Sequence, residues 1–420
     1  MQMKKYKLGD IATVEISGVD KKITDGEKEI RLCNFVDVYY NWAITIAQHD
    51  SFMLATARPN EISKFQLKKG QVALTKDSET RDDIGISTYI ADDFENVILG
   101  YHCALISPNK DILDGCYLNA LLHTDYAKKY FACNASGSGQ RYALSVEALN
   151  SFPVPIIPLH EQKQIGEIFS ALDKKIELNR QINQNLEAMA KQLYDYWFVQ
   201  FDFPNEEGKP YKSSGGEMVW NEKLKRNIPV GWHCGNLFEI AVFTNGLACQ
   251  KFRPKDDEVP LPVIKIREMH DGISVDTEEV TSNIPESVKV YNGDVLFSWS
   301  ASLEVMLWAY GLGGLNQHIF KVTSANDFPK SFYYFQLLDY VDVFKKMAEA
   351  RKTTMGHITQ DHLQQSTIAI PDNKDIADKF EELISPIFKQ IVKLQEEISN
   401  LIKQRDELLP LLMNGQITIE

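Results

Sequence analysis

The sequence has 420 residues, too many for one ordinary hydrophobic core, so we expect two or three folded domains. With 44% hydrophobic and 25% charged residues, the composition is that of a folded protein and excludes a disordered or collagen-like chain. A formal net charge of −13 argues against a protein that coats nucleic acid by bulk attraction. Any contact with nucleic acid must therefore be local.

The N-terminal residues include lysines but no apolar stretch of the signal-peptide kind. No later segment approaches the roughly 20 apolar residues that a membrane span needs. The six cysteines form no CxxC pair and no Cys/His spacing that would hold zinc, so reduced thiols in core positions are expected. These observations predict a cytoplasmic protein with no membrane segment, disulfide or metal site.

In chain order, the first feature is an internal repeat, which indicates two copies of one domain. The first copy contains Leu8-Gly-Asp-Ile-Ala, EIRLCN at 29–34, Gly70-Gln-Val-Ala-Leu-Thr and His102-Cys-Ala-Leu-Ile. The second copy answers with Leu237-Phe-Glu-Ile-Ala, VIKIRE at 263–268, Gly293-Asp-Val-Leu-Phe-Ser and His318-Ile-Phe-Lys-Val. The glycines followed by β-rich runs predict turns that lead into strands.

The repeat divides the chain into five segments. Residues 1–157 and 235–370 are expected to form two similar α+β domains, and residues 158–198 and 371–420 are expected to form a helix after each copy. The segment 199–234 is rich in Gly, Pro and charge but contains several aromatic residues, which a flexible linker would lack. We therefore expect it to be an ordered connection.

The segment from Leu159 to Leu193 has the pattern of a long helix with an apolar stripe that includes two asparagines. The members of this seam are Leu172, Ile176, Asn179, Asn183, Leu186 and Leu193. An Asn in such a seam lowers stability but specifies a single register. The alternative places Ile182 and Met189 in the seam and both asparagines on a solvated edge, because a few turns cannot separate a period of 3.5 from one of 3.6.

The last segment carries a second stripe, with steps of four and three residues that skip only Arg405, a pattern typical of a coiled coil. Its members are Ile387, Ile391, Leu394, Ile398, Leu401 and Leu408. Pro386 precedes this run, and a proline inside a helix costs about 3 kcal/mol or more. We therefore expect the helix to start afresh after Ser385, with a separate short helix at 376–383.

Motifs for catalysis are absent from the sequence. It has no GxxxxGK[ST] phosphate loop, no Gly-rich strand-to-helix turn and no Asn-Pro-Pro-aromatic motif, so neither ATP hydrolysis nor base methylation is expected of this chain. A nuclease-like fragment with Asp202, Glu207 and Lys209 lies in a Gly/Pro-rich connection, which favours a solvated loop over a metal site. No catalytic residue, metal ligand or cofactor is therefore assigned.

The sequence resembles the DNA-specificity (S) subunits of type I restriction-modification enzymes along essentially the whole chain. The most specific segments, in this order, are VPIIPLHEQKQIGEIFSALDKKIELNRQINQNLEAMAKQLYDYWFVQFDFP, GGEMVWN, IPVGW, GDVLFSWSAS and LNQHIFKV. The resemblance implies two target-recognition domains separated by two helices that form an antiparallel coiled coil, in a pseudo-two-fold internal repeat.

The resemblance also implies a non-catalytic role. Each recognition domain would read one half of a bipartite site in double-stranded DNA, with the spacing set by the coiled coil. Two methyltransferase (M) subunits and two restriction (R) subunits would assemble with the chain to methylate adenine N6 and to cleave DNA. S-adenosylmethionine, ATP and Mg²⁺ would be used by these partners, and none would bind this chain.

Within the recognition domains we expect DNA contacts from basic or donor-rich loops and two ring-bearing residues, because base edges and phosphates need well-placed donors. These residues are Lys76, Arg81, Ser138, Gln140, Arg141, Lys251, Arg253, Trp299, His318, Arg351, Lys352 and Thr354. For each, an ordinary solvated or packing role is the alternative. His102 matches His318 in the repeat, and both could be structural instead.

Two other functions remain open at this point. A coiled-coil scaffold with degenerate recognition domains would keep the helices but bind DNA without sequence preference. A self-contained nuclease would cut DNA alone with Mg²⁺, and the missing motifs argue against it.

Overall fold

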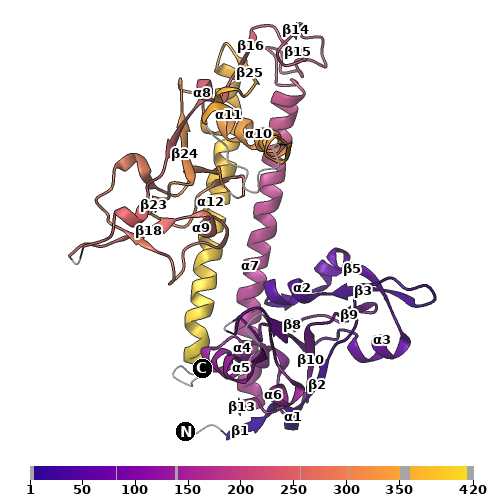
Figure 1. Cartoon of the computed structure of the whole chain (residues 1–420). Helices are drawn as coiled ribbons and strands as arrows, with labels where there is room; N and C mark the ends of the chain where they lie inside the picture. The colour runs from indigo at the N-terminus through magenta and orange to yellow at the C-terminus, as the bar shows by residue number, and fades with distance from the viewer. Residues whose placement is uncertain are drawn as a thin grey trace. The chain divides into compact units, whose positions relative to one another are not determined.

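The computed structural model describes residues 4–81, 83–137, 141–255, 257–300, 302–350 and 360–413, and their side chains except at 347–350, 412 and 413. The chain forms two compact units (Figure 1). Unit 1 contains residues 1–177 and 401–420, and unit 2 contains residues 178–400. Each unit has its own hydrophobic cores, so each is described by itself.

Unit 1 is built on a five-stranded sheet with the order β2-β10-β6-β8-β4 and a three-stranded sheet with the order β5-β3-β9. All four residues of β6 are buried, as a central strand requires. Its elements are β1 Lys4–Lys7, α1 Leu8–Ile11, β2 Ala12–Ile16, β3 Lys28–Cys33, α2 Phe35–Tyr40, β4 Ala43–Ile44, η1 Ile46–Ser51, β5 Met53–Ala57, α3 Pro59–Phe65, β6 Val72–Thr75, β7 Asp77–Ser78, β8 Ser87–Ile90, β9 Val97–Leu99, β10 Cys103–Pro108, α4 Gly115–Leu122, α5 Asp125–Asn134, β11 Ser136–Gly137, β12 Tyr142–Ala143, α6 Val146–Asn150, β13 Pro153–Ile156 and the first part of α7 Leu159–Tyr194.

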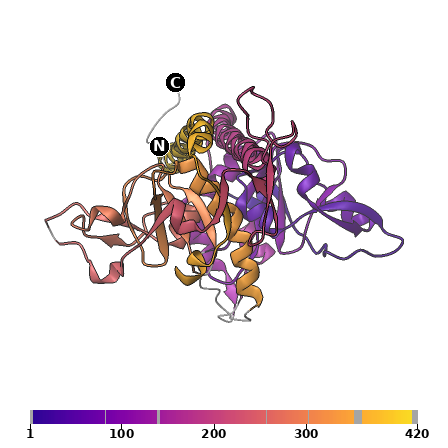
Figure 2. The same ribbon diagram turned by 90° about the horizontal axis from the view of Figure 1, so that it is seen from above.

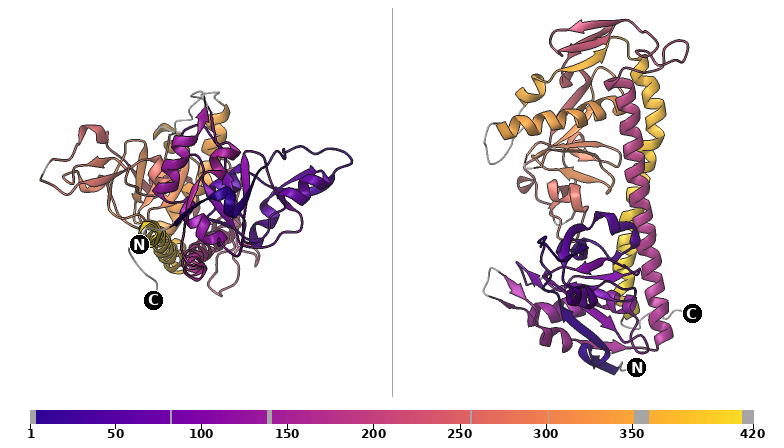
Figure 3. Two further views of the ribbon diagram at one scale, coloured as in Figure 1. Left: turned by 90° about the horizontal axis from the view of Figure 1, so that it is seen from below. Right: turned by 90° about the vertical axis from the view of Figure 1, so that its right-hand side faces the viewer.

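Unit 2 has a four-stranded sheet with the order β17-β24-β21-β22, against which α10 packs (Figure 3, right). Its elements are the end of α7, the π-helix η2 Asp195–Val199, β14 Met218–Asn221, β15 Arg226–Pro229, β16 Trp232–Gly235, α8 Leu237–Ile240, β17 Ala241–Asn245, η3 Cys249–Lys251, β18 Leu261–Ile264, α9 Ile266–Asp271, β19 Glu279–Val280, η4 Glu286–Val288, β20 Lys289–Val290, β21 Val295–Ser298, β22 Glu304–Leu307, β23 Gly313–Leu315, β24 Ile319–Ser324, α10 Lys330–Ala350, α11 Gln360–Gln364, β25 Ile368–Pro371 and the first part of α12 Asp375–Met413. The rest of α12, from residue 401, belongs to unit 1.

The two units contain the same arrangement of strands, so the predicted internal repeat is confirmed. The order β2-β10-β6-β8 in unit 1 corresponds to β17-β24-β21-β22 in unit 2. The strand β3 pairs antiparallel with β5 and parallel with β9, and β18 pairs in the same way with β19 and β23. The pair β1-β13 corresponds to β16-β25.

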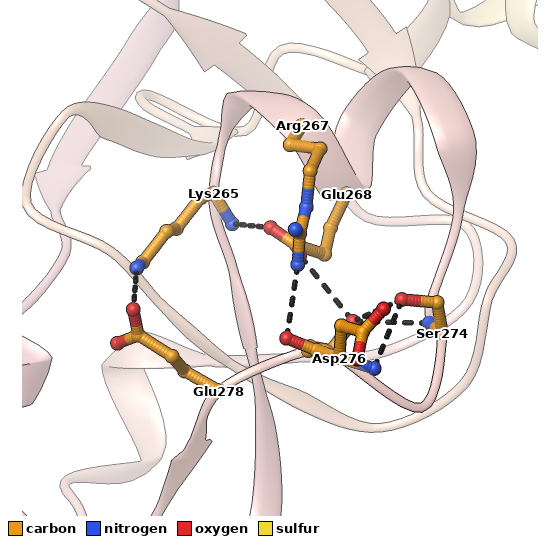
Figure 4. Close-up of polar contacts among 7 residues, drawn as sticks. Lys265, Arg267, Glu268, Ser274, Asp276 and Glu278 are labelled. Atoms are coloured by element: carbon orange, nitrogen blue, oxygen red, sulfur yellow. Dashed lines mark hydrogen bonds and ion pairs between the residues drawn. The ribbon is translucent and has the colours of Figure 1, made fainter. Parts of the chain in front are cut away.

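A short capped helix follows β3 in unit 1, and another follows β18 in unit 2. These two helices show which residues of the two copies are equivalent at this point. In unit 1, Asn34 N–H donates to the Asp37 carboxylate at 2.7 Å, and in unit 2, Lys265 N–H donates to the Glu268 carboxylate at 3.2 Å (Figure 4). Asn34 therefore corresponds to Lys265. The sequence comparison aligned EIRLCN with VIKIRE and was therefore three residues out of register. The end of a strand and the cap of a helix mark equivalent residues more precisely than apolar character does.

In unit 2, the helices α7 and α12 lie side by side and run in opposite directions (Figures 2 and 3). Asn183 contacts Ile391, whereas Tyr194, further along α7, contacts Phe380, earlier in α12. In unit 1, Phe169 of α7 and Leu409 of α12 share one core cluster. All twelve residues proposed for the two seams are buried or half-buried.

The two asparagines of the α7 seam are buried among apolar neighbours. Asn179 is 5% exposed and Asn183 is 6% exposed, whereas Ile182 and Met189 are 36% and 44% exposed. The burial favours the seam that contains the asparagines over the alternative with Ile182 and Met189.

Pro386 lies inside α12, which is continuous from Asp375 to Met413, so the expected break after Ser385 is wrong (Figure 1). The physical reason is the packing on either side of the proline. Ile384 is fully buried and Phe388 is 6% exposed, both in the main core cluster of unit 2. This burial of apolar surface outweighs the backbone cost of the proline.

The connection between α7 and β16 is ordered, with the hairpin β14-β15 at its centre. Its aromatic residues Phe201, Phe203 and Trp232 are buried in the unit 2 core. Within the described part of the chain, no helix combines the length and the apolar character that crossing a membrane would require. The six cysteines are all free thiols.

Candidate nucleic-acid interface

A cluster of basic side chains lies at the small sheet β11-β12-β7 of unit 1. At its centre is Asp77 in β7, whose side chain is only 9% exposed. The Lys76 ammonium lies 3.0 Å from the Asp77 carboxylate, and the Arg141 guanidinium lies 3.5 Å from it. His102 Nδ1 makes a third, short contact with the same carboxylate oxygen.

His102 joins Arg141 to this carboxylate. Its backbone φ is +71°, in the left-handed region that non-glycine residues rarely adopt. Arg141 Nη2 lies 2.6 Å from His102 Nδ1 and 3.0 Å from His102 Nε2. A guanidinium can only donate and an ionised carboxylate can only accept, so the imidazole ring lies between a donor and an acceptor. The imidazole thus positions the guanidinium.

The charge state of Asp77 follows from the same contacts. Burial would raise the pKa of this carboxyl group, but the hydrogen bonds from His102 and Lys76 outweigh burial and lower the pKa. Asp77 is therefore ionised at neutral pH and can hold the surrounding donors in fixed positions.

Arg81 lies at the same sheet. Its guanidinium is 5.1 Å from the centre of the Tyr142 ring, and Tyr142 in β12 pairs with Ser78 in β7. Lys76 and Arg141 thus place two positive charges beside the Asp77 carboxylate, and Arg81 adds a third at the neighbouring Tyr142 ring. The Arg141 side chain is 59% exposed, so it keeps N–H donors for an anionic or base-edge partner.

The equivalent position of unit 2 carries aromatic groups. In unit 1, Lys76 N–H donates to the His102 carbonyl at 2.9 Å; in unit 2, Trp299 N–H donates to the His318 carbonyl at 3.3 Å. The Trp299 and His318 rings lie 5.7 Å apart. The residue after Trp299 is Ser300, so a hydroxyl group stands at the position that the Asp77 carboxylate has in unit 1.

The remaining predicted contacts are more dispersed. Lys251 and Arg253 are exposed in the connection that follows β17. This connection starts beside His318, because Leu247 exchanges backbone hydrogen bonds of 2.8 Å with Leu315 and Gln317. The other predicted residues fall outside the described ones: Ser138, Gln140, Arg351, Lys352 and Thr354.

Three residues of the unit 1 cluster were not among the predicted contacts: Asp77, Tyr142, and His102, which was singled out only as the counterpart of His318. Asp77 follows Lys76 directly, and its exchange for Ser300 in the second copy was a signal that the repeat could have provided. Tyr142 gave no sequence signal, because its contact with Arg81 depends on the pairing of β12 with β7.

Asp202, the carboxylate of the nuclease-like fragment, has a structural role. It accepts hydrogen bonds from Ser213 N–H at 2.7 Å and from Ser213 Oγ at 2.6 Å. These bonds hold two parts of the connection between α7 and β16 together. Glu207 and Lys209 form an exposed ion pair of 2.8 Å.

The duplicated fold thus carries basic groups in one copy and aromatic groups at the same place in the other. Comparison with known proteins agrees. The family model described as type I restriction modification DNA specificity domain matches residues 2–188 and 229–404. The chain therefore belongs to this family. It is a DNA-specificity subunit of type I restriction-modification, and its task is the recognition of DNA sequence.

Relatives named as specificity subunits are about a quarter identical to this chain over the aligned residues. The type I restriction enzyme MjaIX specificity subunit of Methanocaldococcus jannaschii is 25% identical over 320 residues, covering 74% of this chain and 71% of the relative. The HindI specificity subunit of Haemophilus influenzae is 24% identical over 413 residues, covering 84% of this chain and 88% of the relative. The crystal structure of an S subunit from M. genitalium has a TM-score of 0.57 with 14% identity, covering 98% of this chain and 96% of the other, and shows the fold alone.

Proposed function

We propose that this chain reads a bipartite site in double-stranded DNA, one half-site per recognition domain. The observation that carries the proposal is the pair of equivalent positions 76 and 299, which hold a lysine in a basic cluster in unit 1 and a tryptophan beside a histidine in unit 2. Arg and Lys favour the acceptors of guanine, whereas apolar rings favour the thymine methyl group. Two copies with different groups at one place suit an asymmetric site.

The chain itself is proposed to be non-catalytic and to act as the platform for other subunits. Two M subunits would bind the α7 and α12 helices and methylate adenine N6 with S-adenosylmethionine. Two R subunits would join them and cleave DNA with ATP and Mg²⁺. The 36 residues of α7 correspond to about 54 Å at roughly 1.5 Å per residue, long enough for half-sites about 34 Å apart.

Methylation mapping tests this proposal. The chain would be co-expressed with the methyltransferase subunit encoded beside it in a methylation-free host, and the genome would be sequenced for N6-methyladenine. One bipartite motif with a fixed gap supports the proposal and supplies the target. If the complex assembles but no motif appears, the chain is a scaffold with degenerate recognition domains.

A further inference from the structure

Unit 2 contains a cavity of about 630 Å³ that the recognition of DNA does not explain. It is bounded by α7, α10, α12 and the strand β22, all from the same unit. The volume lies within the range of about 300–1,000 Å³ that is usual for small-molecule sites. The cavity is therefore large enough for a ligand of some ten or more heavy atoms.

The floor of the cavity is apolar and aromatic. Leu307 of β22, Phe335 of α10, and Phe388 and Ile391 of α12 line it, and each is buried in the unit 2 core. A ligand that fills this space must present an apolar body to these side chains.

Asn183 places an unused acceptor on the cavity wall. The residue is only 6% exposed, and its Nδ2 donates to the Ile391 carbonyl at 3.3 Å. Its Oδ1 has no hydrogen-bond partner among the described residues. A buried acceptor without a donor is unfavourable, so a ligand that brings an N–H group would stabilise the site.

The cavity wall also carries the carboxyl group of Glu187, which has no ion-pair partner among the described residues. Glu187 lies one helical turn after Asn183 and is exposed at the rim, yet the surrounding protein desolvates its carboxyl group enough to raise the pKa. Lys191, one turn further, cannot neutralise it, because its ammonium group is already held by Asp195 and by Asp339 at 2.9 Å.

A second carboxylate faces the same space from β22. Glu304 lines the cavity and lies 3.3 Å from His270, which is a partner only when the imidazole is protonated. Burial is the largest cause of the raised pKa of the Tyr334 hydroxyl. The negative charges of Glu187 and Glu304 raise this pKa further. Both carboxylates therefore act on one aromatic ring of the lining.

We propose that this cavity binds a small organic cation with an apolar body, of the arylalkylamine class. The ammonium group lies near Glu187 and donates to Asn183 Oδ1, and the apolar body packs on Phe335 and Phe388. This inference does not depend on the DNA contacts of the proposed function. Because α7, α10 and α12 all line the site, the bound amine stabilises their packing.

Three probes of similar shape and different charge test the proposal on the full-length chain by isothermal titration calorimetry. They are 2-phenylethylamine, 2-phenylethanol and phenylacetate. We expect the amine to bind at least 10-fold more tightly than the alcohol, and the acid to bind most weakly. Equal affinities for the amine and the alcohol, or no binding of the amine, would overturn the proposal without the use of any variant.

Variants then locate the bound amine. Glu187→Gln is expected to weaken amine binding at least 10-fold, and Leu338→Trp is expected to abolish it by filling the cavity. The control is Glu167→Gln, an exposed position on α7 outside the lining, which should leave the affinity within twofold. Equal effects of the two Glu→Gln changes would place the amine elsewhere and refute the assignment.

A protein occupant gives a different result. If the free chain binds no amine and Glu187→Gln instead lowers co-purification with the M subunit, the cavity belongs to the subunit interface and the small-molecule proposal is wrong. Methylation mapping is independent of these titrations, so failure of this inference leaves the proposed function intact.

Discussion

At the scale of single residues, one carboxylate organises the unit 1 cluster, which we propose to contact DNA. Asp77 holds Lys76 directly and Arg141 both directly and through His102. The donors are therefore held in position in the free protein, so in the proposed DNA complex less side-chain entropy would be lost on binding. This explains how a chain with a net charge of −13 can carry a local basic site.

Arg141→Gln tests whether this guanidinium contacts a phosphate. We expect weaker binding to every DNA sequence, and a plot of log K against log salt that is less steep by about 0.9, because one counterion fewer is released. Fluorescence anisotropy at several salt concentrations measures both quantities. Lys223→Gln, an exposed lysine of the β14-β15 connection, is the control. A salt slope identical to that of the unaltered protein would refute a phosphate contact.

Asp77→Asn tests the electrostatic role of the carboxylate through pH. Because the folded-state pKa of Asp77 is lowered, its contribution to stability is fully present above the unfolded pKa of about 4 and is lost as the pH falls through the folded value. At pH 7 the unaltered protein should therefore unfold at a higher urea concentration than Asp77→Asn. The difference between the two unfolding midpoints, here called the gap, should narrow below about pH 4. The exposed Asp257→Asn should show no such gap. A gap independent of pH would show that lost hydrogen bonds, not charge, cause the effect.

At the scale of elements, the two long helices combine apolar seams with features that lower their stability. Asn179 and Asn183 are buried in the seam of α7, and each has a side-chain atom without a hydrogen-bond partner in the described structure. Pro386 lies within α12. Apolar residues at positions 179 and 183 would make a more stable seam, so the two asparagines are better explained by a defined register than by stability.

Pro386→Ala tests the cost of the proline in α12. We expect a gain of about 2 kcal/mol in the free energy of unfolding, because alanine restores the backbone donor and removes the ring clash, while the unfolded chain regains some freedom. Urea denaturation followed by circular dichroism measures the change. Lys379→Ala, an exposed position about two turns earlier in α12, should have little effect. A loss of stability in Pro386→Ala would mean that the packing of Phe388 requires the proline geometry.

At the scale of the whole molecule, the duplicated fold predicts that the two half-sites are read independently. Lys76→Ala should relax the methylated motif in one half-site only, and Trp299→Ala should relax it in the other, each by about 1–3 kcal/mol of base discrimination. Methylation mapping of both variants, co-expressed with the M subunit, measures this. Relaxation of both half-sites by either variant alone would contradict a one-domain, one-half-site division.

The sequence by itself determined the repeat, the two long helices and the family, because periodic apolar patterns and matched motifs are local and survive without tertiary contacts. It could also place Lys76, Arg81 and Arg141 among the DNA-contact candidates from their basic character alone. It could not align EIRLCN correctly with the second copy. Two short apolar segments can be aligned in several registers when the sequence does not show where each strand ends.

Only the tertiary structure decided how these residues meet. Asp77, His102 and Arg141 are far apart in the sequence and come together through the pairing of β7 with β12 and the position of β10. It also decided that α12 continues through Pro386, because the burial of Ile384 and Phe388 is a property of the whole core. Contacts between distant residues and the balance between packing and backbone cost are set by the complete fold, so no local pattern could have revealed them.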